Sequence, residues 1–211
     1  MDDWLKEYEE RYPWLVSKGT VVSKKHRRRS TSVNDPLQID WIDEATTDYV
    51  GRIGMTMLPG RNDDGTEALY RRHLAKDLAV LKASGCTTLV TLVEKHELTR
   101  AKVGVQNFFN SVKAAGINAV WYPILDLSAP RPSSVRPVIN RLVSRIRTGE
   151  KVVVHCRAGL GRTGAIVGAI LVEMGYSARF AIEHIREHRK GTIQTLTQEE
   201  FIVRYQKLVN G

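Results

Sequence analysis

The chain has 211 residues, of which 42% are hydrophobic, so it is long enough to bury one sizeable core and close to the usual size of a single domain. Lysine and arginine number 32 against 23 aspartates and glutamates, and the formal charge of +9 favours an acidic or phosphorylated partner. Nucleic acid is not the favoured partner, because the basic residues are spread over many segments and the sequence holds no nucleic-acid-binding signature.

Cysteine content and the N-terminal sequence bear on the cellular compartment. The cysteines are Cys86 and Cys156, and the first ten residues are strongly charged rather than apolar. Such a sequence is typical of a protein of the reducing cytoplasm. Even the apolar run at residues 165–172 is much shorter than a membrane span. We therefore expect a cytoplasmic protein without a membrane-spanning segment.

The first 50 residues differ from the remainder of the chain. Tryptophans are scattered there among charged residues, at Trp4, Trp14 and Trp41, and a basic run at residues 24–29 precedes three hydroxyl side chains. We interpret residues 1–50 as a partly ordered N-terminal extension that packs on the domain, and residues 51–211 as the domain itself. Docking of a partner or targeting by the extension is the alternative interpretation.

From about residue 67 to residue 149 the predicted elements repeat in one order: an amphipathic helix, a glycine that can end it, and a short apolar strand. The glycines are Gly85, Gly116 and Gly149. The strands that follow them cover residues 87–93, 118–124 and 151–155. This alternation predicts an α/β fold with a largely parallel sheet covered by helices.

After residue 155 the sequence predicts helices only. Residues 163–174 are apolar on nearly every face, so we expect that helix to be central and buried. The last helix shows capping-box spacing at Thr197 and Glu200, followed by an apolar face that contains Phe201, Ile202 and Tyr205. We expect it to close the domain.

Residues 152–164, VVVHCRAGLGRTG, place a predicted strand, a glycine-containing loop and a helix start in immediate succession. The backbone N–H groups of such a loop can converge on one anion, and the positive end of the helix faces the same point. Cys156 lies at the centre of this cradle, where the helix end and nearby cations favour a reactive thiolate. The residues whose amides would bind the anion are Arg157, Ala158, Gly159, Leu160 and Gly161.

Three side chains around the loop have further predicted roles. Arg162 offers a planar fork that can hold two phosphate oxygens at once. Thr163 can donate its hydroxyl to the thiolate. His155 is expected to orient the loop by hydrogen bonding rather than to transfer protons. Gly159 and Gly161 let the loop curl without side chains in the way.

Other candidate residues are interpreted as structural. Cys86 lies at a predicted helix-to-strand joint without basic neighbours, as an inert buried thiol would. His184 and His188 stand four residues apart on a predicted helix, but a third ligand is missing nearby. We therefore expect no metal and no other cofactor.

The segment HCRAGLGRTG resembles the HCxxGxxR[ST] signature of the protein tyrosine and dual-specificity phosphatase superfamily. The segments LPG, LKASG, LVTLVEKHEL, YPILD and IQTLTQ are similar to its kinase-associated phosphatase branch, over about residues 50–209. The resemblance implies a single twisted, mostly parallel sheet flanked by helices. It also implies a phosphorylated protein substrate and two chemical steps, in which the thiolate forms a phosphocysteine and water then hydrolyses it.

The leaving group of such a reaction needs a proton from an acid on a separate loop. Asp126 is the candidate, because it follows a predicted strand and begins the loop DLSAPRP, where the family carries its general acid. A turn aspartate is the alternative interpretation. Asp126 would also act as the base in the second step.

The resemblance suggests roles for amide and carboxylate side chains as well. Gln194, in IQTLTQ, corresponds to the glutamine that positions the attacking water, and Gln198 is a second candidate. Glu94 and Glu97 are candidates to support Arg162. A solvent-exposed position without a catalytic role is the alternative for each of them.

Other activities remain open at this point. The same cradle serves phosphoinositide and RNA 5′-phosphate hydrolysis in related families, although lipid-directed relatives tend to carry two basic residues in the loop and this chain has Leu160 there. A module that binds phosphorylated partners without turnover is a different class of function. Intact Cys156, Arg162 and Asp126 favour the phosphoprotein phosphatase.

Overall fold

A five-stranded sheet with the strand order β2-β3-β7-β5-β6 forms the centre of the fold. The computed structural model describes residues 27–42, 50–65 and 68–211. The strands are β2 (Asp40–Trp41), β3 (Arg52–Thr56), β5 (Thr88–Thr91), β6 (Asn118–Trp121) and β7 (Lys151–His155). All neighbours are parallel except β2, which runs antiparallel to β3. The predicted α/β fold with a mostly parallel sheet is confirmed.

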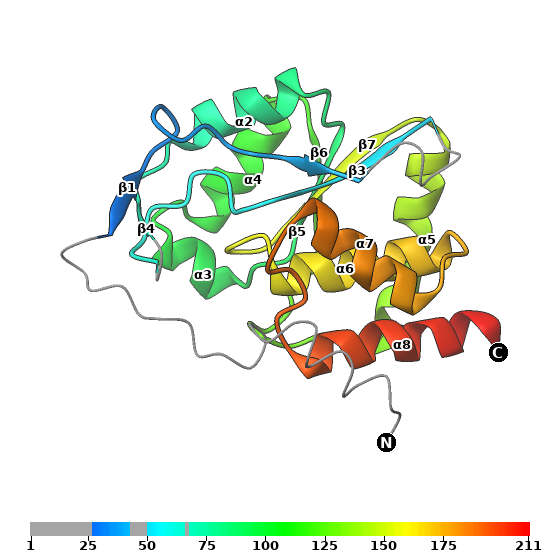
Figure 1. The fold of residues 1–211 in the computed structure, drawn as a ribbon. Helices are drawn as coiled ribbons and strands as arrows, with labels where there is room; N and C mark the ends of the chain where they lie inside the picture. Colours follow the sequence, from blue (N-terminus) through cyan, green and yellow to red (C-terminus); the bar gives the residue numbers. More distant parts are fainter. Residues whose placement is uncertain (1–26, 43–49, 66–67) are drawn as a thin grey trace.

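Helices cover both faces of this sheet, as Figure 1 shows. They are α2 (Leu74–Ala83), α3 (Lys95–Arg100), α4 (Val105–Ala114), α5 (Pro132–Arg147), α6 (Gly161–Glu173), α7 (Ala178–His188) and α8 (Leu196–Asn210). The chain runs outward across the sheet from β3 through β5 to β6 and then returns to β7. Because crossovers between parallel strands are right-handed, helices on the outward path cover one face of the sheet and helices on the return path cover the other. Accordingly α2 packs on α4, whereas α5, α7 and α8 surround α6.

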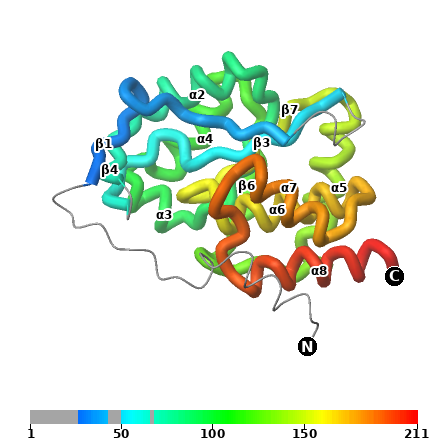
Figure 2. The backbone as a smooth tube through the Cα atoms, viewed as in Figure 1, coloured from blue at the N-terminus to red at the C-terminus, as the bar shows by residue number. Residues whose placement is uncertain are grey.

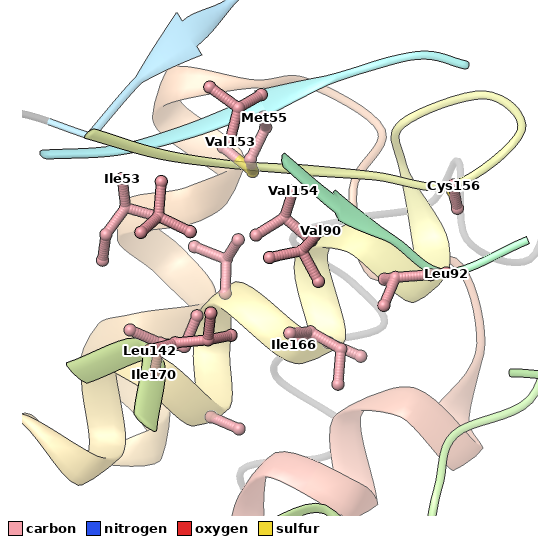
Figure 3. Packing of buried hydrophobic residues seen from close by; sticks show 14 of the residues in the cluster. Ile53, Met55, Val90, Leu92, Leu142, Val153, Val154, Cys156, Ile166 and Ile170 are labelled. Carbon is pink, nitrogen blue, oxygen red and sulfur yellow. The ribbon is translucent and has the colours of Figure 1, made fainter. Parts of the chain in front are cut away.

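Helix α6 is the central helix, as the sequence predicts. Every residue from Gly161 to Val172 is buried, because α6 lies between β3 and β7 of the sheet and the helices α5, α7 and α8. Figure 3 shows Ile166 and Ile170 of α6 in one cluster with Val90 and Val154 of the sheet. A largely apolar helix therefore forms the inner layer on which the functional loop is built.

The last helix begins earlier than the capping-box spacing predicts. Thr195, and not Thr197, caps α8, because the Thr195 hydroxyl accepts the N–H of Gln198 at 3.3 Å. Phe201, Ile202 and Tyr205 are buried, so the predicted apolar face is confirmed. Figure 2 shows the chain from the blue strand β1 at one end of the molecule to the red α8, whose C-terminal end lies at the other end.

Residues 28–42 make backbone pairs with later parts of the chain. Strand β1 (Arg28–Ser30) pairs in parallel with β4 (Ala68–Tyr70), and β2 joins the edge of the main sheet. A buried ion pair between Arg72 and Asp77, at 2.8 Å, secures this region, since Arg72 also donates to the backbone oxygen of Asp35 at 2.7 Å. The domain boundary at residue 50 stays a prediction.

The described residues include the later part of the predicted extension, from residue 27 to residue 42, and residue 50. Trp4, Trp14 and residues 24–26 of the basic run lie outside the described residues. Trp41 is half-buried in β2, with the guanidinium of Arg52 over its ring at 5.1 Å. Among the helices of the described part of the chain, none combines the length and the apolar character that a bilayer crossing requires.

The central position of α6 makes a prediction about stability. Ile170→Ala should lower the free energy of unfolding by about 2–5 kcal/mol, because the side chain is fully buried and its removal leaves a cavity. Urea denaturation measures this value. Val50→Ala is the control, since that side chain is 86% exposed and its loss should change the stability by about 0.5 kcal/mol or less. Equal effects of the two changes would contradict the packing described here.

Candidate active site

A cleft of about 620 Å³ opens at the carboxyl end of β7. Strand β7 lies between β3 and β5, where the chain direction across the sheet reverses, and such switch points form crevices in open α/β sheets. The cleft is lined by the loop that joins β7 to α6, by the segment that follows β6 and by the segment between α7 and α8. Of the residues predicted from the sequence, it is lined by Asp126, Cys156, Arg157, Ala158, Leu160, Gly161, Arg162, Gln194 and Gln198.

Cys156 lies where the chain leaves β7. Its sulfur accepts the backbone N–H of Gly159 at 3.3 Å, which is the first contact of the predicted amide cradle. Figure 3 shows Cys156 at the border of the apolar cluster, beyond Leu92 of the neighbouring strand end. The thiol is therefore only 3% exposed, yet it forms part of the cleft wall.

Gly159 is required at its position by the shape of the loop. Its φ angle is +74°, in the region that favours glycine, and a Cβ atom there would lie 2.2 Å from the backbone oxygen of Thr56. Gly161 is constrained differently, because a Cβ atom there would lie 2.8 Å from the side-chain amide of Gln198. The loop thus packs directly on the end of β3 and on α8.

Arg162 is buried and its guanidinium is held from two sides. It donates to both carboxylate oxygens of Glu97, at 2.6 and 2.8 Å, and to the backbone oxygen of Ile124 at 2.9 Å. A further ion pair at 2.9 Å joins it to Asp126. Bidentate contact with Glu97 fixes the plane of the fork, which keeps the donors aimed at the cleft.

The charges around Arg162 shift the pKa values of both partners. Burial lowers the pKa of Arg162, but the bonds to Glu97 and the charges of Cys156, Glu97 and Asp126 raise it above its ordinary value. Burial raises the pKa of Glu97, but the hydrogen bond and charge of Arg162 hold it below its ordinary value. Both groups are therefore charged at neutral pH. Of the two glutamates proposed from the sequence, Glu97 is the one that contacts Arg162.

Glu94 has a local role instead. It precedes α3 as the N-cap residue, and its backbone N–H donates to the Glu97 carboxylate at 2.9 Å. Glu94 therefore helps to fix the carboxylate that holds Arg162.

His155 is fully buried behind the loop. Its Nδ1 donates to the backbone oxygen of Cys156 at 3.1 Å, and its Nε2 lies 2.9 Å from the hydroxyl of Thr91. Burial lowers the pKa of His155 to about 4, so the ring is neutral at neutral pH. With both nitrogens engaged, the ring fits an orienting role.

Thr163 differs from the sequence-based expectation. Its hydroxyl is buried, and within the described residues it has no hydrogen-bond partner, so the predicted bond to Cys156 is not formed in this structure. The hydroxyl lies in the first turn of α6, where the helix backbone fixes its position. A catalytic role of Thr163 stays a prediction.

The segment after β6 carries Asp126 and is tied to α8. The side chain of Asp126 is 57% exposed, in contrast to the buried Arg162 with which it pairs. The Thr195 hydroxyl donates to the oxygen of Leu127 at 3.2 Å, and Gln198 Nε2 donates to the oxygen of Ser128 at 3.3 Å. Helix α8 therefore positions the loop that holds the candidate acid.

Gln194 and Gln198 are brought together at the start of α6. The backbone N–H of Gln194 donates to Gln198 Oε1 at 2.8 Å. A Cβ atom on Gly161 would lie within 2.9 Å of side-chain oxygens of both residues. Gln194 has the more accessible side chain of the two, since Gln198 is fully buried.

Further charged residues, which the sequence does not mark as candidates, lie beside the loop and contact it or its neighbours. Arg157 donates to Asp63 at 2.9 Å, and Arg61 donates to the same carboxylate at 2.8 Å. Burial raises the pKa of Asp63, but these bonds and charges hold it below its ordinary value. Arg189 and Asp40 also line the cleft. No motif marks Arg61, Asp63, Arg189 or Asp40. For Asp63, Arg189 and Asp40 the reason is that each contacts a segment far away in the sequence.

The residues interpreted as structural lie in different environments. Burial raises the pKa of Cys86 to about 12, as is typical of an inert thiol. His188 lines the cleft, with its ring 4.4 Å from that of His184. Over residues 27–42, 50–65 and 68–211, no group of three or more metal-binding side chains is assembled.

Comparison with known proteins identifies similar sequences and folds. The family model described as polymorphic toxin system, DSP-PTPase phosphatase matches residues 65–176. Cyclin-dependent kinase inhibitor 3 from Sus scrofa is 28% identical over 170 residues, which are 79% of this chain and 77% of that protein. Protein tyrosine phosphatase type IVA 3 from Mus musculus is 32% identical over 117 residues, which are 54% of this chain and 62% of that protein.

The fold comparison agrees with these matches. Kinase associated phosphatase, in a crystal structure with its catalytic-site cysteine changed to serine, superposes with a TM-score of 0.73 at 24% identity. The match covers 83% of this chain and 97% of that chain. The resemblance to the dual-specificity phosphatases near the kinase-associated branch is confirmed.

The pair of Arg162 and Glu97 makes a prediction about stability and pH. Glu97→Gln should lower the free energy of unfolding by about 3 kcal/mol at neutral pH, because it leaves a buried cation partly uncompensated. The folded-state pKa of Glu97 lies below its ordinary value of 4.5, so its ionised form stabilises the fold above that pH. This stabilisation is lost as the pH falls through the lowered pKa.

Urea denaturation at about pH 7 and about pH 3 measures this effect. The difference in the free energy of unfolding between wild type and Glu97→Gln should be smaller at the lower pH. Glu183→Gln is the matched control, because Glu183 forms an exposed pair with Arg179 on α7 and its loss should cost about 0.5 kcal/mol or less. A difference that stays constant with pH would exclude Glu97 as the titrating group.

Proposed function

This chain belongs to the polymorphic toxin system DSP-PTPase phosphatase family, and we propose that it hydrolyses phosphomonoesters on protein side chains through a phosphocysteine intermediate. The proposal rests on one observation about the cleft. There, the Cys156 sulfur accepts a hydrogen bond from a backbone amide, and Glu97 aligns the guanidinium of Arg162. A tetrahedral dianion would contact a nucleophile, amide donors and a planar cation there at the same time.

The first step proposed is attack of the Cys156 thiolate on phosphorus. Arg162 and the loop amides bind the phosphate oxygens and stabilise the charge that develops on them. Because the chain holds these donors in place before substrate arrives, little reorganisation is needed during the reaction. The bond from phosphorus to the leaving oxygen then breaks, and a phosphocysteine remains.

Asp126 is proposed to protonate that leaving oxygen. Its carboxylate contacts the Nη2 of Arg162 at 2.9 Å, so a bound phosphate would compete with it for the same donor. Displacement by the phosphate would separate Asp126 from this cation, so that its carboxyl group could take up a proton from solvent. The protonated carboxyl would then face the leaving oxygen at the open side of the cleft and donate that proton to it. In the second step Asp126 would take a proton from a water molecule that Gln194 positions, and the water oxygen would bond to phosphorus. The phosphorus–sulfur bond would break at the same time, which releases inorganic phosphate and restores the Cys156 thiolate.

The choice among substrates rests on the loop and its surroundings. The loop carries one cation besides Arg162, and this cation, Arg157, is already held by Asp63. That arrangement favours a phosphoprotein over a phosphoinositide or an RNA 5′-phosphate, which remain the alternatives. We further propose that the protein acts in the cytoplasm on phosphorylated partners, and that residues 1–50 form an extension through which a partner could dock.

Replacement of the nucleophile tests the proposed function. Wild type should hydrolyse a small aryl phosphate without added metal and be inhibited by vanadate, and Cys156→Ser should lose turnover by about 10³-fold or more. Binding of a phosphopeptide should be retained, because the amides and Arg162 survive the change. Fluorescence anisotropy of a labelled phosphopeptide measures the binding.

Cys86→Ser is the control for this experiment, since that buried thiol lies outside the cleft and its replacement should leave turnover intact. A Cys156→Ser variant as active as wild type would refute the proposed enzymatic mechanism. A folded wild type that binds phosphopeptide but shows no turnover would favour the binding module.

The role of Asp126 is tested by varying the leaving group. Asp126→Asn should slow alkyl phosphates such as phosphoserine peptides by about 10²–10⁴-fold, because a poor leaving group needs the proton. An activated aryl phosphate should be affected far less. The rate constant plotted against leaving-group acidity measures the effect, and a uniform loss over all substrates would indicate that another residue supplies the proton.

A further inference from the structure

The amide cradle depends on how the peptide groups of its loop are turned. A peptide group is planar, and in the trans form its C=O and the following N–H point in opposite directions. An N–H that points toward the anion therefore requires the preceding carbonyl to point away from it. The loop can hold an anion only if its carbonyls are kept on the outside.

Each carbonyl from residue 156 to residue 160 has a donor on the outer side of the loop. Three of the donors belong to neighbouring structure: His155 Nδ1 for Cys156, the N–H of Leu58 for Arg157 at 3.3 Å, and the N–H of Gly164 for Leu160 at 2.8 Å. The remaining two carbonyls, in the middle of the loop, receive their hydrogen bonds from a single side chain.

That side chain is Arg189, the residue directly after α7. Its Nε donates to the oxygen of Gly159 at 2.7 Å, and its Nη2 donates to the oxygen of Ala158 at 3.2 Å. These two carbonyls belong to the same peptide groups as the N–H of Gly159 and the N–H of Leu160. The N–H of Gly159 is the one that contacts the Cys156 sulfur. Arg189 thus fixes the peptide group that touches the nucleophile.

Asp40 fixes Arg189 in turn. Its carboxylate forms an ion pair with Nη1 of Arg189, across 149 residues of sequence. Asp40 lies in β2, at the edge of the sheet, so the strand holds one end of the guanidinium and the loop holds the other. A lysine could not replace this arrangement, because its single ammonium lacks the planar fork that reaches two carbonyls and a carboxylate together.

The middle of the loop is also where an external support is most needed. Gly159 has a positive φ angle and no side chain, so its flanking peptide groups are the freest of the loop to rotate. If either peptide group turned over, a carbonyl oxygen would face the phosphate in place of an N–H. Two bonds from one rigid guanidinium oppose that rotation.

We propose that Arg189 is a positioning residue for phosphate binding and that Asp40, from the segment before the family-matched residues 65–176, orients it. The inference rests on the proposed function, because it concerns the same cradle. Neither residue is proposed to bond to the reacting groups. Arg189 acts through the peptide groups of Ala158 and Gly159, and Asp40 acts through Arg189.

The test compares variants of Arg189 by the affinity of the cradle for an anion. Arg189→Lys keeps the charge and loses the fork, and Arg189→Met loses both. Each should bind inorganic vanadate about 10- to 100-fold more weakly in titration calorimetry, the ratio expected for loss of hydrogen bonds from a charged donor. Alkylation of Cys156 by iodoacetamide at a fixed neutral pH should slow as well, because the sulfur loses its aligned amide.

Arg179→Met is the matched control, since Arg179 lies on α7 in an exposed pair with Glu183 and points to no part of the cleft. It should bind vanadate and react with iodoacetamide as wild type does. Thermal unfolding of every variant separates positioning from stability. Wild-type vanadate affinity in a folded Arg189→Met variant would overturn the proposal, as would an equal loss in Arg179→Met.

Asp40 supplies a second, independent test should the Arg189 variants not fold. Asp40→Asn keeps the size of the side chain and removes its charge, so vanadate binding should weaken by several-fold, about half of the Arg189→Met effect on a logarithmic scale. In the double variant Asp40→Asn with Arg189→Met, affinity should be no lower than in Arg189→Met alone. Additive losses would show that Asp40 does not act through Arg189.

Failure of this inference can be distinguished from failure of the proposed phosphatase function. Vanadate binding is measured without turnover, so it tests the support of the loop even if the wild type hydrolyses no aryl phosphate. Conversely, active wild type with an unaffected Arg189→Met variant would leave the phosphatase proposal intact and remove this inference alone.

Discussion

The contact between Arg162 and Glu97 is the interaction on which the cleft depends. A buried guanidinium costs a large desolvation free energy unless a carboxylate and further acceptors surround it. Glu97 meets this requirement with two bonds, and Ile124 adds a third. These contacts connect helix α3, which follows β5, with the segment that follows β6 and with the start of α6. The position of the phosphate fork is therefore a consequence of how the parallel strands align.

Helix α6 of the apolar core places charged side chains at the edge of the sheet where the cleft opens, and ion pairs there compensate the charges. Helix α6 is buried along almost its whole length, and its N-terminal turn carries Arg162 and Thr163 to the end of the sheet. Ion pairs then surround the loop: Arg162 with Glu97, Arg157 with Asp63, and Arg189 with Asp40. Each of these three cations is oriented by a carboxylate from another segment, which limits repulsion between them before an anion binds.

How much of this arrangement the sequence predicts depends on the separation of the residues in the chain. Cys156, Arg162 and the amides between them are contiguous, so the strand, the loop and the helix fix their geometry locally. The helix-glycine-strand order likewise predicts the parallel sheet. Glu97 is 65 residues from Arg162, and Asp40 is 149 residues from Arg189. Pairing at such distances follows from tertiary packing, which spacing and periodicity do not encode, and the interpretation of residues 1–50 as an appended segment gives no reason to expect Asp40 in the cleft.

The loop that would hold phosphate is fixed more firmly than the side chain of Asp126, and the proposed chemistry explains this difference. The loop that would hold phosphate has a donor for each central carbonyl and is packed against β3, so it has little freedom to move. Asp126 is mostly exposed, on a segment that α8 and its capping residue hold through the backbone of Leu127 and Ser128. A phosphate site gains from rigidity, because its donors then need no reorganisation. An acid that must leave Arg162, face a leaving group and later accept a proton from water has to move between these positions. Tethering the neighbouring backbone while leaving the carboxylate largely exposed meets both requirements within one cleft.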